Sequence, residues 1–309
     1  MDAEPPTPSQ LLELLLQQTE SEKAEEILQQ LATCWESVLP RWLEVREEAM
    51  RGQRDICLPL ELIDQSLLQS LGDRAAAILI RYLEDPQRAA QSACLLARLG
   101  QSCIPILIDE LRKPTDQSQV ERQAGACLVL SSLGDLAIPA LIETLSDDNG
   151  WTFAALALAR MGPDVMETLL LSLEMQNADG VGVVVQEIGP EAYPLLLDTL
   201  ATDRAQAAVF ALIRIGRNVA PDLAQLLCDP VRGRYAYAAL VQLGIEAVES
   251  LMELLESPNE SVRYMSANTL GRIGQDADRA IPSLTDLVIS DPNSLVREAA
   301  QEALSRISA

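Results

Sequence analysis

The sequence contains no histidine, and only 3% of its 309 residues are aromatic. Without histidine, neither a Ser-His nor a Cys-His nucleophile pair can form, and a histidine-ligated metal site is impossible. The six cysteines include no C-x-x-C pair, so we interpret them as reduced thiols that serve as small apolar residues. We therefore expect no catalytic residues, no metal and no cofactor. An iron-sulfur cluster that joins distant cysteines remains the alternative.

Positive charge is also scarce. Lys and Arg number 23 against 46 Asp and Glu, which gives a formal net charge of -23. Such a field repels phosphate backbones and anionic lipid, so we expect neither a nucleic acid nor a membrane as partner. The acidity has two interpretations: a well-solvated surface, or attraction to a basic partner protein.

Long apolar segments are missing as well. The N-terminal stretch MDAEPPTPSQ is acidic and rich in proline, and it has no basic region followed by an apolar one. No uninterrupted apolar run approaches the roughly 20 residues that a membrane helix needs. These features predict a cytoplasmic protein.

A repeated helical hairpin is what the sequence does contain. In residues 262–284, an apolar helical pattern ends at Gly274, and a second helix is expected to open near Pro282. Glycine suits the position after a helix because it adopts positive φ without a Cβ clash, and proline suits a first helical turn. Eight of the glycines that follow an apolar residue recur at intervals of 27 to 34 residues: Gly72, Gly100, Gly134, Gly162, Gly189, Gly216, Gly244 and Gly274. The spacing predicts eight helical hairpins over residues 58–309.

Residues 1–57 do not match the repeat and predict a helical cap. Ser9 and Ser21 are candidate first-turn caps of two helices. Pro40 is expected to interrupt the pattern that follows. Trp35 and Trp42 are seven residues apart, so they share a face if the helix resumes and would pack onto the first repeat. A cap is required because the end of a repeat array otherwise exposes an apolar face.

The pattern D-P-x-x-x-V-R-x-x-A-A-x-A-L-x-x-I-G resembles the short HEAT-like repeats of the phycobilisome lyase type. It is clearest in SDPNSLVREAAQEAL (290–304) and LGDLAIPALIETL (133–145). The resemblance implies an all-α fold, an α-α superhelix in which hairpins stack as a solenoid. It also implies two functions. One is a non-catalytic scaffold or assembly factor that binds a partner protein; the other is a phycobilin lyase subunit or a chaperone of tetrapyrrole attachment.

Arginine recurs at one phase of the helices that precede the glycines. Residues seven apart share a helix face, and this phase lies outside the Leu/Ala core. We expect it to line the concave side of the solenoid and to bind a partner protein, because arginine and aromatic residues dominate binding sites. The alternative is that these arginines pair with nearby carboxylates while the aromatics fill gaps between repeats. The candidate partner-binding residues are Arg98, Trp151, Phe153, Arg160, Arg214, Tyr235, Tyr264 and Arg272.

Two segments depart from the repeat. Gly180 and Gly182 weaken the helix in NADGVGVVVQEIG, and they indicate either close helix packing or a groove floor cleared for a partner. The loop 112–119 adds about six residues, and it is either a tolerated insertion or a contact site.

The scaffold is the preferred function. In a lyase, the arginines could pair with chromophore propionates and the aromatics could stack on the rings. However, the Trp-Trp-rich N-terminal region of those lyases is missing here, since Trp35 and Trp42 are too far apart to replace it.

Overall fold

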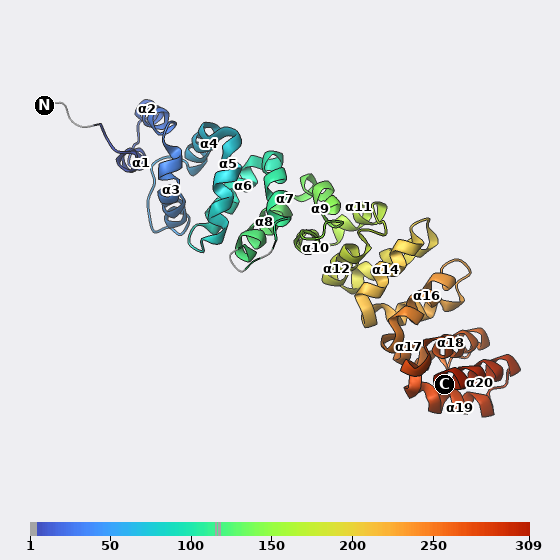
Figure 1. Cartoon of the computed structure of the whole chain (residues 1–309). Helices are drawn as coiled ribbons and strands as arrows, with labels where there is room; N and C mark the ends of the chain where they lie inside the picture. The colour runs from blue at the N-terminus through green and yellow to red at the C-terminus, as the bar shows by residue number, and fades with distance from the viewer. Residues whose placement is uncertain (1–4, 115, 117–118) are drawn as a thin grey trace. The chain divides into compact units, whose positions relative to one another are not determined.

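The computed structural model describes residues 5–114, 116 and 119–309, and every regular element in these ranges is helical (Figure 1). The fold is therefore all-α, as the repeat pattern predicts. The chain divides into two compact units, Met1–Ala157 and Leu158–Ala309, and the boundary falls within helix α10 (Trp151–Arg160). Of the loop 112–119, residues 115, 117 and 118 lie outside the described ranges, as do residues 1–4 at the proline-rich start.

The cap of unit 1 consists of α1 (Pro8–Leu16), α2 (Ser21–Leu31) and α3 (Trp35–Met50). The prediction that Ser9 caps α1 is wrong, because the cap is Thr7. Its hydroxyl accepts from the Gln10 N–H at 3.3 Å, while the Gln10 side chain accepts from the Thr7 N–H at 2.8 Å. Ser21 is likewise not the cap of α2, since Glu20 holds that position without a side-chain hydrogen bond.

Helix α3 runs through Pro40 without interruption, so the predicted break at this proline is wrong. Trp35 and Trp42 are fully buried on this helix, and their packing outweighs the loss of one backbone hydrogen bond. The Trp42 indole N–H donates to Asp64 of α4 (Leu60–Leu71) at 3.1 Å. The expected packing of the cap on the first repeat is thereby confirmed.

The repeats of unit 1 are hairpins in which a first helix ends at a glycine and a shorter second helix follows. They comprise α4, α5 (Ala75–Leu79), α6 (Ala89–Leu99), α7 (Ile104–Leu111), α8 (Val120–Ser132), α9 (Ile138–Thr144) and most of α10.

The repeats of unit 2 have the same plan. Their first helices are α12 (Ala178–Ile188), α14 (Ala205–Ile215), α16 (Gly233–Leu243), α18 (Glu260–Ile273) and α20 (Ser294–Ile307), and each contacts the next. Their second helices are α11 (Met166–Leu171), α13 (Tyr193–Asp198), α15 (Ala220–Gln225), α17 (Val248–Leu254) and α19 (Ile281–Ser290).

The glycine turns follow the sequence prediction. All eight glycines have positive φ, from 52° at Gly72 to 104° at Gly189. Pro282 lies in the first turn of α19, as expected. One feature was not predicted: a 3-10 turn follows each glycine before the second helix begins. In unit 2 these turns include η8 (Gly216–Val219), η10 (Gly244–Ala247) and η11 (Gly274–Ala280).

The core of unit 2 is a thin layer of aliphatic residues between successive first helices. Leu270 of α18 and Ala300 of α20 are fully buried. At Gly271 an added Cβ would lie 2.7 Å from the Ala303 Cα, so these two helices approach as closely as backbone allows. Small residues in the core therefore set the short distance between repeats.

Acidic residues ahead of the first helices join consecutive repeats. Asp291, just before α20, accepts two hydrogen bonds from the Arg263 guanidinium of α18, at 2.7 and 3.0 Å. Arg263 also donates to the Ser257 carbonyl at 2.8 Å. This bonding holds the pKa of the Asp291 carboxyl below its usual range. The ion pair is nearly buried, so it fixes α18 to the turn of the next repeat.

Residues Ala89–Leu111 are long and apolar enough to cross a membrane by length and composition alone. In the structure they are α6 and α7, two helices of one hairpin that meet at Gly100, where φ is 59°. Two apolar core helices that follow each other in the sequence meet the same criteria of length and composition as a membrane helix.

Candidate functional site

The first helices of unit 2 expose one polar face. At the position two residues before the glycine, Arg160 ends α10, Arg214 lies on α14 and Arg272 lies on α18, and all three side chains are exposed. Glu187 on α12 and Gln242 on α16 take the same position. Solvent exposure at this phase agrees with the sequence prediction that it lies outside the core.

These three arginines differ from their neighbours in having no counter-charge. Within the described part of the chain, Arg160, Arg214 and Arg272 form no ion pair or hydrogen bond, and the same holds for Arg217 and Arg279. By contrast, four other arginines of unit 2 pair with carboxylates: Arg204, Arg232, Arg263 and Arg306. We call the unpaired five the open arginines. The alternative in which carboxylates neutralise the repeated arginines therefore does not describe these positions.

A pocket of about 750 Å³ lies on this face. Three consecutive first helices and two glycine turns contribute to it: α12, α14, η8, α16 and η10. Its volume lies in the range of ligand pockets. The lining residues are Asp179, Phe210, Ile213, Arg214, Ile215, Gly216, Arg217, Asn218, Gln242 and Glu246.

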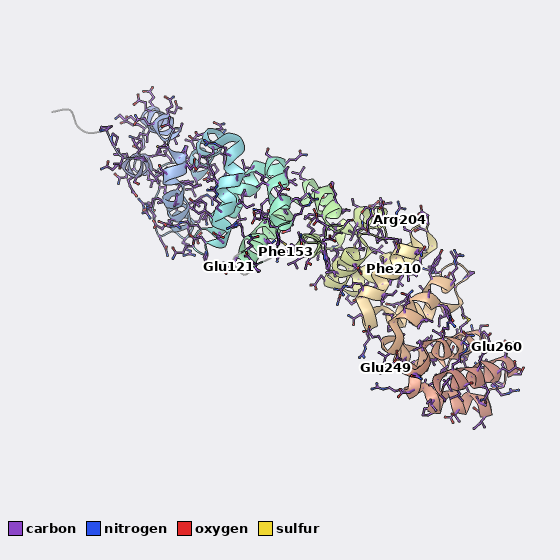
Figure 2. The ribbon with its side chains drawn as sticks, in the orientation of Figure 1. Glu121, Phe153, Arg204, Phe210, Glu249 and Glu260 are labelled. Carbon is purple, nitrogen blue, oxygen red and sulfur yellow. The ribbon has the colours of Figure 1, made fainter. Side chains whose placement is uncertain are left out.

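Phe210 supplies an apolar surface at the pocket. Its ring is 40% exposed, and Figure 2 shows it on α14, four residues before Arg214. Sequence reasoning missed this residue because it examined only the positions two and nine before each glycine. The signal was present in the position six before, since i and i+4 lie on one helix face.

Gly182 determines how α12 and α14 meet behind the pocket. A Cβ added there would lie 2.6 Å from the Ala211 carbonyl oxygen and 2.7 Å from the Arg214 Cβ. Of the two interpretations of the glycine-rich break, close helix packing is the one that this geometry shows. Gly182 thereby places the base of the Arg214 side chain directly against α12. Gly180 is buried on the same helix.

A second, smaller pocket of about 270 Å³ adjoins the first. Arg217 and Glu246 line both pockets, and the second adds Arg279 from η11. The Glu246 carboxylate comes close to Gly216, where an added Cβ would be 2.7 Å from its Oε2. The two pockets therefore follow three successive glycine turns, η8, η10 and η11. The other lining residues are Ile245, Val248, Glu249 and Met252.

Tyr235 and Tyr264 lie in unit 2 but line neither pocket. The Arg234 guanidinium is 4.5 Å from the centroid of the Tyr235 ring and donates to its hydroxyl at 2.8 Å. Tyr264 on α18 is 38% exposed. The structure thus places Arg214 at the pocket and leaves the two tyrosines elsewhere on unit 2.

Arg98, Trp151 and Phe153 belong to unit 1. Arg98 donates to Asp64 at 3.2 Å, so this arginine follows the internally paired alternative. Trp151 and Phe153 are half-buried on α10. Their predicted role in partner binding stays a prediction.

Asp64 is the centre of a buried charge cluster in unit 1. Its carboxylate is fully buried and accepts from Trp42 of α3, from Arg46 of α3 at 3.1 Å, and from Arg98 of α6. Arg46 also donates to Gln91 and, at 3.2 Å, to the Cys94 sulfur. This cluster ties the cap to the first two repeats, and its one carboxylate is shared by two guanidinium groups.

The loop 112–119 carries two cations that are both paired. Arg112 lies 3.1 Å from Asp147, and Lys113 lies 2.5 Å from Glu110. These pairs are internal to unit 1. A loop whose charges are satisfied within the fold fits a tolerated insertion.

The six cysteines form no disulfide within the described residues, and five of them lie in unit 1. Burial raises the pKa of the Cys103 thiol to about 11, which keeps it protonated and unreactive near neutral pH. No group of three or more Cys, Asp or Glu side chains within the described ranges is placed to hold a metal ion.

Comparison with known proteins supports the repeat class. A family model described as HEAT repeats matches residues 220–305, which cover α15 to α20 almost completely. Residues 220–305 are therefore similar to HEAT repeats. A solved structure concerned with a phosphorylation switch in the interaction between cadherin and beta-catenin contains a similar chain. That likeness has 15% identity, covers 98% of this chain and 82% of the other, and has a TM-score of 0.27. No curated protein matches the sequence.

Proposed function

We propose that this HEAT-like repeat protein is a non-catalytic scaffold or assembly factor that holds a partner protein in the groove on the first-helix face of unit 2. The observation that carries the proposal is that two open arginines, Arg214 and Arg217, line a 750 Å³ pocket together with an exposed phenylalanine. Arginine and aromatic side chains supply most of the binding energy in protein interfaces. HEAT-like repeats commonly serve as protein-interaction scaffolds.

The stability of the fold does not account for the open arginines or for the exposed Phe210. An exposed unpaired arginine adds little to folding, and a ring that is 40% exposed forgoes part of its burial energy. The unpaired arginines and the exposed ring both contribute to binding energy when a second protein covers them. The proposal therefore explains a feature that the fold alone does not require.

The test places a photoreactive benzoylphenylalanine at Phe210, at Glu249 beside the second pocket and, as a control, at Glu260, in cells that express the protein. Glu249 lies on α17, and the control position Glu260 lies at the start of α18 (Figure 2). We expect a crosslink to one protein at Phe210 and none at Glu260. That protein is then identified by mass spectrometry, purified, and titrated against the chain by calorimetry.

In that titration, Arg160→Ala combined with Arg214→Ala should weaken binding by about 1–3 kcal/mol per desolvated contact. The melting temperature should hardly change, because neither arginine has a partner within the fold. A lowered melting temperature with unchanged affinity would reject this face as the binding site.

A phycobilin lyase subunit is the second candidate. The specific observation in its favour is Arg214 beside Phe210 in a pocket of ligand size, since arginine can pair with propionates while an aromatic ring stacks on a tetrapyrrole. Visible absorption that co-purifies with the protein, and is lost in Phe210→Ala, would select the lyase. A colourless complex with a partner protein would select the scaffold.

A further inference from the structure

The open arginines are unusual because carboxylates are abundant in this protein. Acidic residues outnumber basic ones 46 to 23. In unit 1, carboxylates pair with Arg46 and Arg98 at Asp64 and with Arg112 in the loop 112–119, and among the described arginines of that unit only Arg81 forms no ion pair. Five arginines of unit 2 form neither an ion pair nor a hydrogen bond within the described residues, and they point to carboxylates that another molecule supplies.

Three of the open arginines follow one line on the surface. Arg214 lines the first pocket, Arg217 lines both pockets, and Arg279 lines the second. We call these three the arginine row. The two pockets share Arg217 and Glu246, so they adjoin each other along the turns η8, η10 and η11. We call the two adjoining pockets the channel.

We propose that the arginine row binds an extended, acidic segment of the partner protein. This inference rests on the proposed scaffold function and specifies the segment that is recognised. A guanidinium donates two parallel hydrogen bonds to a carboxylate, which fixes both position and orientation. Apolar side chains of the segment contact Phe210 and Ile213 in the first pocket, and Ile245 and Met252 in the second.

The repeat spacing predicts where the acidic residues of the segment fall. Packed helices lie about 8–10 Å apart, and an extended chain advances about 3.3 Å per residue. One repeat therefore corresponds to roughly three residues of the bound segment. Arg214 and Arg217 lie in one repeat and Arg279 lies two repeats later, so acidic residues roughly six positions apart, with apolar residues between them, match the row.

Carboxylates in the same channel restrict which acidic segments fit. Asp179 lines the first pocket, Glu249 lines the second, and Glu246 lines both. They repel an acidic residue placed opposite them. Segments whose acidic residues face these carboxylates instead of the arginine row should therefore bind more weakly. Glu246 in particular separates the sites of Arg214 and Arg279.

The experiment measures the fluorescence anisotropy of three labelled peptides with the intact chain at about 0.15 M salt. The probes are GSELFQILEGSG, its neutral analogue GSQLFQILQGSG and its basic analogue GSKLFQILKGSG. We expect the acidic probe to bind about tenfold more tightly than the neutral one. The basic probe should bind no better than the neutral one, despite the net charge of the chain.

Substitutions distinguish binding at the arginine row from a general effect of charge. Arg214→Ala and Arg217→Ala should each weaken the acidic probe about tenfold, and Arg217→Glu should shift the preference toward the basic probe. Arg306→Ala is the matched control, because Arg306 lies on α20 in an exposed pair with Glu302 and should leave binding unchanged. Circular dichroism of each variant verifies the fold.

Equal binding of the three probes, or an equal loss in Arg306→Ala, would overturn the inference. These outcomes are distinct from failure of the scaffold itself. A partner captured at Phe210 without any preference for the acidic probe rejects the arginine row and keeps the scaffold. An acidic preference without any captured partner rejects the scaffold and keeps an anionic peptide site.

Discussion

At the scale of single residues, the two units use the same side chain in two ways. Arg98 and Arg46 are held by Asp64, whereas Arg214 faces solvent with no partner in the described chain. The difference follows from what lies opposite each arginine on the neighbouring helix. Asp64 on α4 faces α3 and α6, while Gly182 on α12 faces Arg214 and offers no side chain at all.

Asp64→Asn should lower the free energy of unfolding of unit 1 by about 3–5 kcal/mol, because it leaves the buried Arg46 without a counter-charge. Urea denaturation followed by circular dichroism measures the change. Glu61→Gln, on the exposed side of the same helix, is the control and should stay within about 0.5 kcal/mol of the wild type. Equal effects of the two substitutions would show that the cluster does not hold the cap.

The Arg263–Asp291 ion pair predicts a pH dependence. Because the pKa of Asp291 is lowered in the folded state, its contribution to stability is complete above its unfolded pKa of about 3.9 and is lost as the pH falls through the folded pKa. Asp291→Asn should therefore lower the melting temperature at pH 7, and the difference from wild type should shrink below about pH 4. Calorimetry across this range measures the difference. A gap that is constant with pH would mean that the charge of Asp291 does not matter.

At the scale of helices, Gly182 is the position where the packing of α12 against α14 leaves no room for a side chain. Ala ordinarily stabilises a helix by about 1 kcal/mol relative to Gly. Here a Cβ would meet the Ala211 carbonyl oxygen and the Arg214 Cβ, so α12 and α14 would have to separate. Gly182→Ala should therefore lower the melting temperature and also weaken binding at Arg214.

Glu187→Ala is the control for that substitution, since Glu187 is exposed on the same helix. It should leave stability within about 0.5 kcal/mol of the wild type. If Gly182→Ala instead stabilised the protein, the close contact between α12 and α14 would be contradicted.

The helices were predictable because their ends are chemically marked. Each glycine follows an apolar residue and takes positive φ, and Pro282 lies in a first turn, as local sequence dictates. The uninterrupted α3 was not predictable from Pro40 alone, because burial of Trp35 and Trp42 decides it. Tertiary packing overrode the local preference.

Only the helix face on which the candidate site lies was predictable from the sequence. Exposure of Arg160, Arg214 and Arg272 follows from helix periodicity. The pocket depends on the approach of α12 to α14, on the contact of Glu246 with Gly216, and on the 3-10 turns, which a repeat pattern does not encode. The sequence therefore indicated the face, and the structure indicated where on that face a pocket lies.

At the scale of the whole molecule, stability should be distributed over repeats. Leu270→Ala removes a fully buried side chain between α18 and α20 and should cost about 2–5 kcal/mol. Because stability in a repeat array is largely a sum of nearest-neighbour terms, the loss should appear as earlier melting of unit 2, with unit 1 little changed. Far-UV circular dichroism during heating measures this, and its native spectrum should show helix without strand. A loss below about 0.5 kcal/mol would show that the helix phase is misassigned.

The ion pair between Arg263 and Asp291 also has a mechanical consequence. It joins α18 to the turn before α20 through two hydrogen bonds, with an additional bond from Arg263 to its own turn at Ser257. When the chain is pulled from its ends, separation of these repeats must break the two bonds to Asp291 together, while the bond to Ser257 holds the guanidinium in place. Under tension, the stack of α18 and α20 should therefore give way later than the pair α16 and α18, between which the described residues form no such bridge.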